Sequence, residues 1–302
     1  MAHEVAPEGM ALFEGFERER VETPGAEIEL VRGGDGPPVL LLHGHPQTHA
    51  MWHLVAPRLA EEFTVVATDL RGYGDSSKPF GDADHSTYSK RAMAGDQASV
   101  MESLGFDSFA VLGHDRGGRV GHRMALDLPD RVTKLAVLDI VPTRHIFQTV
   151  GKDLATAYYH WFFYIQPYDL PETLIGANPS YYLHKKLGGW GTSLEAFAPE
   201  ALAEYERCYG AATIHASCED YRAAASIDLV HDEADLDEGR KVECPLLALW
   251  GGRGVMERIY DVRAVWRECA NDVRGRPLDA GHYLAEERPE ETAQELRSFL
   301  QG

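Results

Sequence analysis

The sequence contains few basic residues and no long apolar segment. Its 302 residues include 29 Lys and Arg against 48 Asp and Glu, which gives a formal charge of −19. Nucleic-acid-binding proteins neutralise phosphates with clustered Lys and Arg, so this balance excludes that class and disfavours an anionic membrane surface. No stretch approaches the roughly 20 apolar residues of a membrane span, and the N-terminal segment lacks a secretory apolar run. We therefore expect a cytoplasmic protein without nucleic-acid or membrane partners.

Cysteine is also scarce. Cys208, Cys218, Cys244 and Cys269 lie far apart in the sequence, without the close spacing of metal-binding pairs. We expect reduced thiols, no disulfide framework and no metal site. Hydrophobic residues make up 44% of the chain, which is enough for a packed core. The length suits one large α/β domain, or a core with an inserted subdomain.

Short apolar runs alternate with helical patterns over much of the chain. The expected strands are Ile28–Val31, Val39–Leu42, Thr64–Thr68, Phe109–Leu112, Leu135–Asp139 and Leu246–Trp250. The expected helices are Met51–Glu61, Ser89–Leu104, Gly118–Asp127, one within Met256–Cys269, and Pro289–Leu300. Continuous apolar strands separated by helices are typical of a mostly parallel sheet that is buried on both faces.

The alternation stops between about Pro142 and Lys241. This stretch is rich in aromatic residues and contains no convincing strand. We predict a helical cap over residues 143–240, inserted into an α/β core formed by residues 1–142 and 241–302. A helical insertion over a parallel sheet would enclose a cavity beside the carboxyl ends of the strands, where such sheets bind ligands.

Asp115 lies in the motif that carries the chemistry. The apolar run Phe109–Leu112 leads into Gly-His-Asp-Arg-Gly-Gly, residues 113–118, and then into a helix. This is the strand–turn–helix pattern of a nucleophile flanked by glycines, with Asp where ester hydrolases carry Ser. A carboxylate there can attack carbon and form an ester with the enzyme. The alternative is that Asp115 merely caps the following helix.

Two further segments favour the catalytic interpretation. His43-Gly44-His45 follows a strand, as an oxyanion loop would, so the backbone N–H groups of His45 and Arg116 are the expected oxyanion donors. His282 follows Asp-Ala-Gly and precedes the final helix, where the general base belongs in this architecture. We expect His282 to activate water.

Arg116 and Arg119 lie three residues apart and therefore share a helix face. Both fall in the first helical turn, where the helix dipole disfavours cations, which indicates a functional demand. A nucleophilic carboxylate about 4 Å from a substrate carboxylate would meet a repulsion of about 4 kcal/mol at an effective dielectric near 20. Two guanidinium groups would offset this repulsion and bind the substrate carboxylate. Alternatively, one of them pairs with an acid, for which the candidates are Asp69, Asp75 and Glu219.

These motifs resemble the α/β-hydrolase superfamily over about residues 12–300, and within it the branch with an Asp nucleophile. The resemblance implies an α/β-hydrolase fold, a mostly parallel sheet flanked by helices with an inserted helical cap. Many relatives place the triad acid after the strand Leu246–Trp250, but the loop here has no carboxylate before Glu257. Asp139, at the end of the preceding core strand, is therefore the expected acid that orients His282.

The motif Gly113–Arg119, together with His43–Gln47 and the segments beginning at Asp69 and Leu135, resembles fluoroacetate dehalogenases in particular. The resemblance implies hydrolysis of a small anionic haloacid to glycolate and halide through an ester of Asp115, without a metal or organic cofactor. A homodimer is also a family-level expectation.

The same resemblance implies that three cap side chains donate hydrogen bonds to the leaving halide. These are His160, Trp161 and Tyr221. His45 departs from the family pattern, because an apolar aromatic residue is common there, and this changes the polarity expected of the pocket.

Two other functions remain open at this point. An epoxide hydrolase would use the same Asp nucleophile and His base, with cap tyrosines as donors, but a neutral epoxide would not need Arg116 and Arg119. A non-catalytic binding protein of the same fold is disfavoured because Asp115, Asp139 and His282 are all present.

Overall fold

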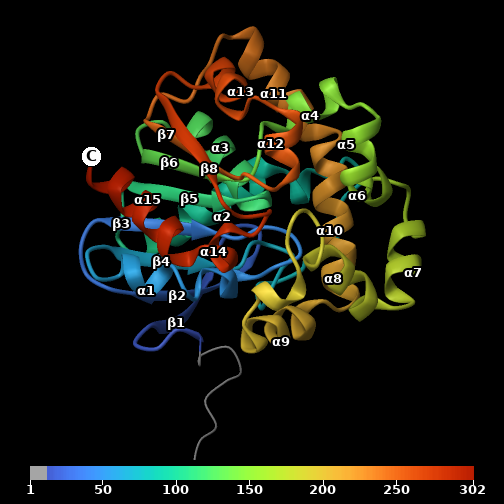
Figure 1. Ribbon diagram of the computed structural model, residues 1–302, viewed down its shortest axis with the longest axis horizontal. Coiled ribbons are helices and arrows are strands. Elements are labelled where there is room, and N and C mark those ends of the chain that lie inside the picture. Colours follow the sequence, from blue (N-terminus) through green and yellow to red (C-terminus); the bar gives the residue numbers. More distant parts are fainter. Residues whose placement is uncertain (1–11) are drawn as a thin grey trace, which may run out of the picture.

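An eight-stranded, mostly parallel sheet forms the centre of the computed structural model, which describes residues 12–302 (Figure 1). The strands are β1 (Glu17–Glu22), β2 (Glu27–Gly33), β3 (Pro38–Leu42), β4 (Thr64–Thr68), β5 (Phe109–His114), β6 (Val132–Leu138), β7 (Leu246–Gly251) and β8 (Val273–Leu278). Their order is β1-β2-β4-β3-β5-β6-β7-β8, and only the β1–β2 and β2–β4 pairs are antiparallel. The predicted fold class is confirmed.

All six expected strands are present, but the two strands at the sheet edges were missed. The sequence of β1 is ERERVE and that of β8 is VRGRPL, and both have exposed residues along their length. An edge strand buries less side-chain surface than a central one, so its sequence lacks the apolar run that marks β3 to β7. Edge strands were therefore not detectable from hydrophobicity.

The helices outside the insertion flank the sheet. They are α1 (Ala56–Leu59), α2 (Lys90–Ser103), α3 (Arg116–Asp127), α12 (Val255–Ile259), α13 (Val262–Cys269), α14 (Leu284–Glu287) and α15 (Pro289–Gln301). The single helix expected over Met51–Glu61 was wrong, because that stretch contains a 3₁₀ turn at His49–Trp52 and the short α1. Similarly, the helix expected within Met256–Cys269 is two helices, and the side chain of Asp261 caps the second.

Between β6 and β7 the chain forms helices and loops without a strand, as expected. These helices are α4 (Thr143–Thr149), α5 (Lys152–Ala157), α6 (Tyr159–Tyr164), α7 (Leu170–Gly176), α8 (Pro179–Leu187), α9 (Pro199–Cys208), α10 (Ala211–Ala224) and α11 (Ile227–Asp237). We call α4–α11 the cap. In Figure 1 most of them lie beside one end of the sheet, away from the C-terminus.

The segments that carry the candidate residues leave the sheet at one edge. β3, β5, β6 and β8 run parallel and end directly before the segments that contain His45, Asp115, Asp139 and His282. The carboxyl ends of parallel strands meet at the same edge, where open α/β sheets bind ligands. The cap contacts this edge, since the ring of Trp190 lies 5.1 Å from that of His282.

The four cysteines are free thiols, two of them buried and two partly buried. Across residues 12–302, no helix is both long enough and apolar enough to cross a membrane.

Candidate active site

Asp115 lies at a strained turn between β5 and α3. Its backbone has φ 45° and ψ −114°, a conformation that side chains other than glycine rarely adopt. The flanking glycines are required by close packing. A Cβ atom at Gly113 would lie 2.5 Å from the carbonyl oxygen of Gly117, and one at Gly117 would lie 2.4 Å from that of His43. The sequence motif therefore fixes the position of the carboxylate above the sheet edge.

The Asp115 side chain does not cap α3, which removes the alternative interpretation of this residue. Instead, its Oδ2 atom accepts a hydrogen bond of 3.0 Å from the backbone N–H of His45. No hydrogen bond within residues 12–302 involves Oδ1. Burial would raise the pKa of Asp115, but the positive charges of His282, Arg116 and Arg119 hold it below its ordinary value. The group is an ionised carboxylate with one free oxygen.

His282 and Asp139 form the second part of the site. The Nδ1 of His282 donates to Oδ2 of Asp139 over 2.6 Å, while the backbone N–H of Gly251 donates to Oδ1 over 2.9 Å. Burial would lower the pKa of His282, but the hydrogen bond and charge of Asp139, with the charge of Asp115, raise it above its ordinary value. Asp139 thus orients the imidazole and stabilises its protonated form.

His114 positions His282 and was not recognised from the sequence. Burial lowers its pKa to about 3, so it is neutral near pH 7 and its Nε2–H donates to the carbonyl of His282 over 2.9 Å. Its ring lies 4.5 Å from the ring of His282, and Trp190 packs against the same imidazole. The position of His114 directly before the expected nucleophile was the only signal in the sequence.

Arg116 is buried and pairs with an acid that sequence reasoning did not consider. Its Nε and Nη2 donate to the carboxylate of Asp220 over 2.9 and 2.6 Å. The three acids named as alternatives, Asp69, Asp75 and Glu219, were therefore the wrong candidates. The Nη1 atom of Arg116 is buried and has no hydrogen-bond partner among residues 12–302. Asp220 immediately precedes Tyr221 in the sequence, so the motif that indicated the tyrosine already contained it.

Arg119 has no carboxylate within salt-bridge distance in the described part of the chain. Its Nη1 donates to the carbonyl of Val141 and to Oγ1 of Thr143 over 2.9 and 3.1 Å, whereas its Nε has no partner within the described residues. Burial and the neighbouring Arg116 lower its pKa to about 10, so it stays charged at neutral pH. Arg119 is a buried cation whose charge is available to an incoming anion.

The cap brings the three expected halide donors together over the arginines. The ring of Tyr221, from α10, lies 5.5 Å from that of His160 and 5.7 Å from that of Trp161, both from α6. The Cζ of Arg116 lies 4.2 Å from the centre of the Tyr221 ring. Neither Trp161 nor Tyr221 uses its N–H or O–H in a side-chain hydrogen bond within residues 12–302, and Nδ1 of buried His160 is unpartnered. These groups are free to donate to a ligand.

The two backbone N–H groups expected to stabilise the oxyanion, those of His45 and Arg116, differ in their contacts with Asp115. The N–H of His45 already contacts Asp115, whereas no such contact is found for the N–H of Arg116, which stays a prediction. The His45 side chain lies in the same aromatic cluster, where its Nε2 is 3.0 Å from the hydroxyl of Tyr164. Burial lowers the pKa of His45 to about 3, so it adds polarity but no charge to the pocket.

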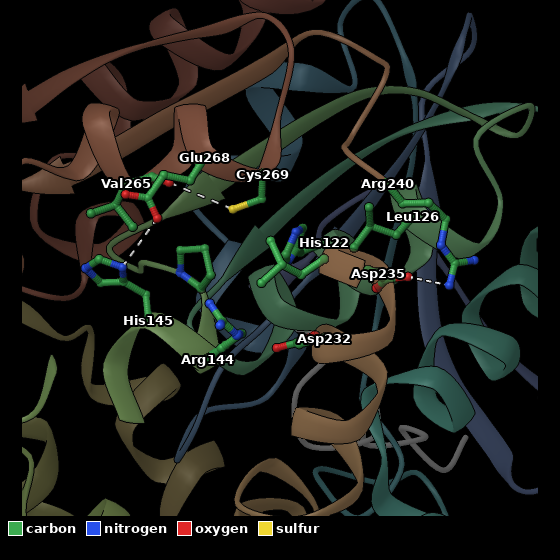
Figure 2. A pocket seen from close by; sticks show the side chains of 12 residues that line it. His122, Leu126, Arg144, His145, Asp232, Asp235, Arg240, Val265, Glu268 and Cys269 are labelled. Carbon is green, nitrogen blue, oxygen red and sulfur yellow. Dashed lines mark hydrogen bonds and ion pairs between the residues drawn. The ribbon is translucent and has the colours of Figure 1, made fainter. Parts of the chain in front are cut away.

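A separate cavity of about 90 Å³ lies between α3, α4, α11 and α13 (Figure 2). It is lined in part by His122, Asp232 and Cys269. Its lining includes neither the candidate catalytic residues nor Arg116 or Arg119. It is therefore not the candidate site. Within residues 12–302, no three His, Cys, Asp or Glu side chains lie close enough together to hold a metal ion.

Comparison with known proteins adds to this geometry. A family model of the alpha/beta hydrolase fold matches residues 37–289. A fluoroacetate dehalogenase from Burkholderia sp is 50% identical over 96% of this chain and 95% of its own length. A soluble epoxide hydrolase from Corynebacterium sp. (strain C12) is 34% identical over 88% of this chain and 91% of its own.

A solved structure is similarly close. The crystal structure of a protein from Nostoc sp PCC 7120 described as an alpha/beta hydrolase superimposes with a TM-score of 0.93 at 60% identity. The match covers 95% of this chain and 99% of that one.

Proposed function

The chain belongs to the α/β-hydrolase family, and from that premise we propose that it hydrolyses a haloacetate, with fluoroacetate as the expected substrate, to glycolate and halide. The observation that carries the proposal is Arg119, a buried cation without a carboxylate partner beside the Asp115 carboxylate. A buried charge left uncompensated is costly, and an anionic substrate supplies the missing partner. The name of the Burkholderia relative agrees with this substrate class.

Substrate binding follows from the groups that remain free. The substrate carboxylate is bound by Arg119 and by the unpartnered Nη1 of Arg116. These charges offset the repulsion between the substrate carboxylate and Asp115. The halogen then points toward Trp161 and Tyr221, whose donors are unoccupied.

In the first step, Oδ1 of Asp115 attacks the halogen-bearing carbon. A carbon–oxygen bond forms, the carbon–halogen bond breaks, and the halide leaves with the bonding electron pair. Fluoride is a poor leaving group, so hydrogen bonds from His160, Trp161 and Tyr221 that strengthen as the anion forms lower this barrier selectively. The product of this step is a glycolyl ester of Asp115.

In the second step, His282 removes a proton from water and the resulting hydroxide attacks Cγ of the ester. Esterification has removed the negative charge of Asp115, which is one cause of the raised pKa of His282, so the imidazole becomes neutral more readily at this stage. The oxyanion develops on Oδ2, where the N–H of His45 already donates. As the intermediate collapses, protonated His282 donates its proton to the departing alkoxide oxygen and glycolate leaves. The acid formed on Asp115 then loses its proton to solvent, which regenerates the carboxylate.

Single turnover in heavy-oxygen water tests the covalent route. With enzyme in excess over fluoroacetate, the first glycolate should carry little label, because its new oxygen comes from Asp115. With substrate in excess in the same water, later turnovers should release labelled glycolate. Full labelling in the first turnover would contradict the ester intermediate, whereas absence of halide release would contradict the function itself.

Epoxide hydrolysis is the second candidate, since a relative carries that name and the cap offers buried Tyr158 and Tyr221 as donors. A neutral epoxide, however, leaves the charge of Arg119 uncompensated. Parallel assays of halide release from fluoroacetate and chloroacetate and of styrene-oxide opening separate the two. We expect halide release without epoxide opening.

A further inference from the structure

Most buried cations in the described part of the chain are paired with carboxylates. Seven Lys and Arg side chains are buried within residues 12–302. Five have a carboxylate within 4.0 Å, in the pairs Arg71–Asp96, Lys90–Asp220, Arg116–Asp220, Arg123–Asp235 and Arg222–Glu172. Arg119 and Lys186 are the two that lack such a partner in the described part of the chain.

Lys186 lies in the last turn of α8, surrounded by aromatic rings rather than by acids. Its Nζ is 3.8 Å from the centre of the Tyr159 ring, 5.1 Å from that of Trp190 and 5.5 Å from that of Tyr182. Aromatic faces and a helix C-terminus both favour a cation, so they compensate part of the cost of burial. Burial lowers the pKa of Lys186 to about 7.

The surroundings of Lys186 place it at the halide end of the candidate site. Tyr159 directly precedes His160, and the Trp190 ring that contacts Lys186 also lies 4.9 Å from the ring of His160. After burial, the charge of Lys186 is the next cause that holds the pKa of His160 well below its ordinary value. Arg119, on core helix α3, contacts Val141 at the end of the core and Thr143 at the start of cap helix α4. The two cations without a carboxylate partner in residues 12–302 therefore come from different parts of the chain, Arg119 from core helix α3 and Lys186 from cap helix α8.

We propose that Lys186 determines specificity for the leaving group. Its positive charge, which lies beyond His160, stabilises the halide that leaves toward the cap while Asp115 attacks the substrate. The inference rests on the proposed haloacetate hydrolysis. The substrate is anionic at its carboxylate before reaction and becomes anionic at the halogen during it, so each unpaired cation faces one of the two negative charges. Charge that appears only in the transition state is where a fixed cation accelerates the reaction. Fluoride holds its charge in the smallest volume and should depend on Lys186 more than chloride does.

The test compares two substrates in Lys186→Met under single-turnover conditions, with enzyme in excess and released halide measured over time. We expect the rate constant for fluoride release to fall about tenfold and that for chloride release to change by less than about twofold; a tenfold change corresponds to about 1.4 kcal/mol. Lys186→Arg, which retains the charge, should restore most of the fluoride rate. Lys185→Met is the matched control, because Lys185 is its exposed neighbour on the same helix and should leave both rates unchanged.

The ratio of the two rate constants separates an electrostatic role from a structural one. Loss of folded enzyme or a shifted cap slows both substrates together and leaves the ratio unchanged. An equal fall for both halides, or no fall for either, would overturn the proposal. Lys186→Gln, which keeps most of the side-chain stem, provides the same comparison if thermal melting shows that the Met variant is unstable. If the wild-type protein releases neither halide, the proposed function has failed, and not the role of Lys186.

Discussion

At the carboxyl edge of the sheet the backbone positions the reacting groups, whereas in the cap side-chain packing positions them. Asp115 and Asp139 both have positive φ, 45° and 52°, directly after parallel strands. His160, Trp161 and Tyr221 instead belong to ordinary helices and are positioned by ring contacts of 5.5 to 5.7 Å. A residue with a strained backbone conformation has its side chain fixed in one position by the surrounding structure. Packed aromatic side chains, in contrast, can be substituted by others of similar size. We therefore expect the core to set the reaction and the cap to set which leaving group is accepted.

The largest expected effect comes from the core. His282→Asn removes the base but leaves Asp115 free to attack, so each enzyme should release halide once and then retain the ester. Steady-state turnover should fall by about 10²–10⁴-fold, the usual contribution of a general base. Intact-mass measurement after incubation with chloroacetate would detect the ester. Normal turnover would show that His282 is not the base and that the core does not set the reaction.

The next effect concerns the contact that joins the two regions. Asp220, on cap helix α10, accepts from Arg116, Lys90 and Tyr73 of the core. Asp220→Asn would remove the carboxylate that pairs with buried Arg116 and leave Lys90 with Asp228 alone. The free energy of unfolding should therefore fall by about 3–5 kcal/mol, measured by urea denaturation.

Glu291→Gln is the control for that measurement. It removes a charge beside the half-exposed Arg276 and should cost less than about 1 kcal/mol. If Asp220→Asn costs no more than this control, side-chain packing alone joins the cap to the core.

A smaller effect should follow from crowding the turn. Gly117→Ala would place a Cβ 2.4 Å from the carbonyl oxygen of His43, and overpacking of this kind costs about 1–3 kcal/mol. Gly95→Ala is the matched control in α2, where nothing lies within 4 Å, and it should stabilise the protein by about 0.5–1 kcal/mol. Thermal melting of the two variants measures both. Equal melting temperatures would mean that the turn is not tightly held.

The smallest effect is on pH dependence. Hydrolysis of the ester requires neutral His282, so its rate should rise with pH through the pKa of that residue. Asp139 raises this pKa, and Asp139→Asn should therefore move the midpoint of the rise to lower pH while also slowing the reaction. Chemical quench of the ester across a pH series gives the midpoint. A midpoint that moves upward would contradict the assigned role of Asp139.

How much could be predicted from the sequence also differs between the two regions. Buried strands such as β3 and β5 are short apolar runs, and the motif around Asp115 encodes its own turn through glycines. Local sequence therefore locates the reacting groups of the core.

In the cap, no local sequence pattern identifies the candidate site residues. His160 and Tyr221 were named only because of a family resemblance, and no pattern separates them from the packing aromatics around them. Arg116–Asp220 spans 104 residues of sequence, and the partner of a buried cation at that distance depends on the complete fold. Lys186 looks like any helix-terminal lysine until its burial is known. The homodimer is expected only from the family resemblance and stays a prediction.

The hydrogen bond between His282 and Asp139 joins residues 143 positions apart, with the entire cap between them in sequence. Closing so long a loop has a high entropic cost, and contacts of this kind tend to form late in folding. During synthesis, the segment that carries His282 emerges after the sheet strands and the cap. The last part of the chain to be synthesised therefore supplies the group that, in the proposed reaction, frees Asp115 for another turnover.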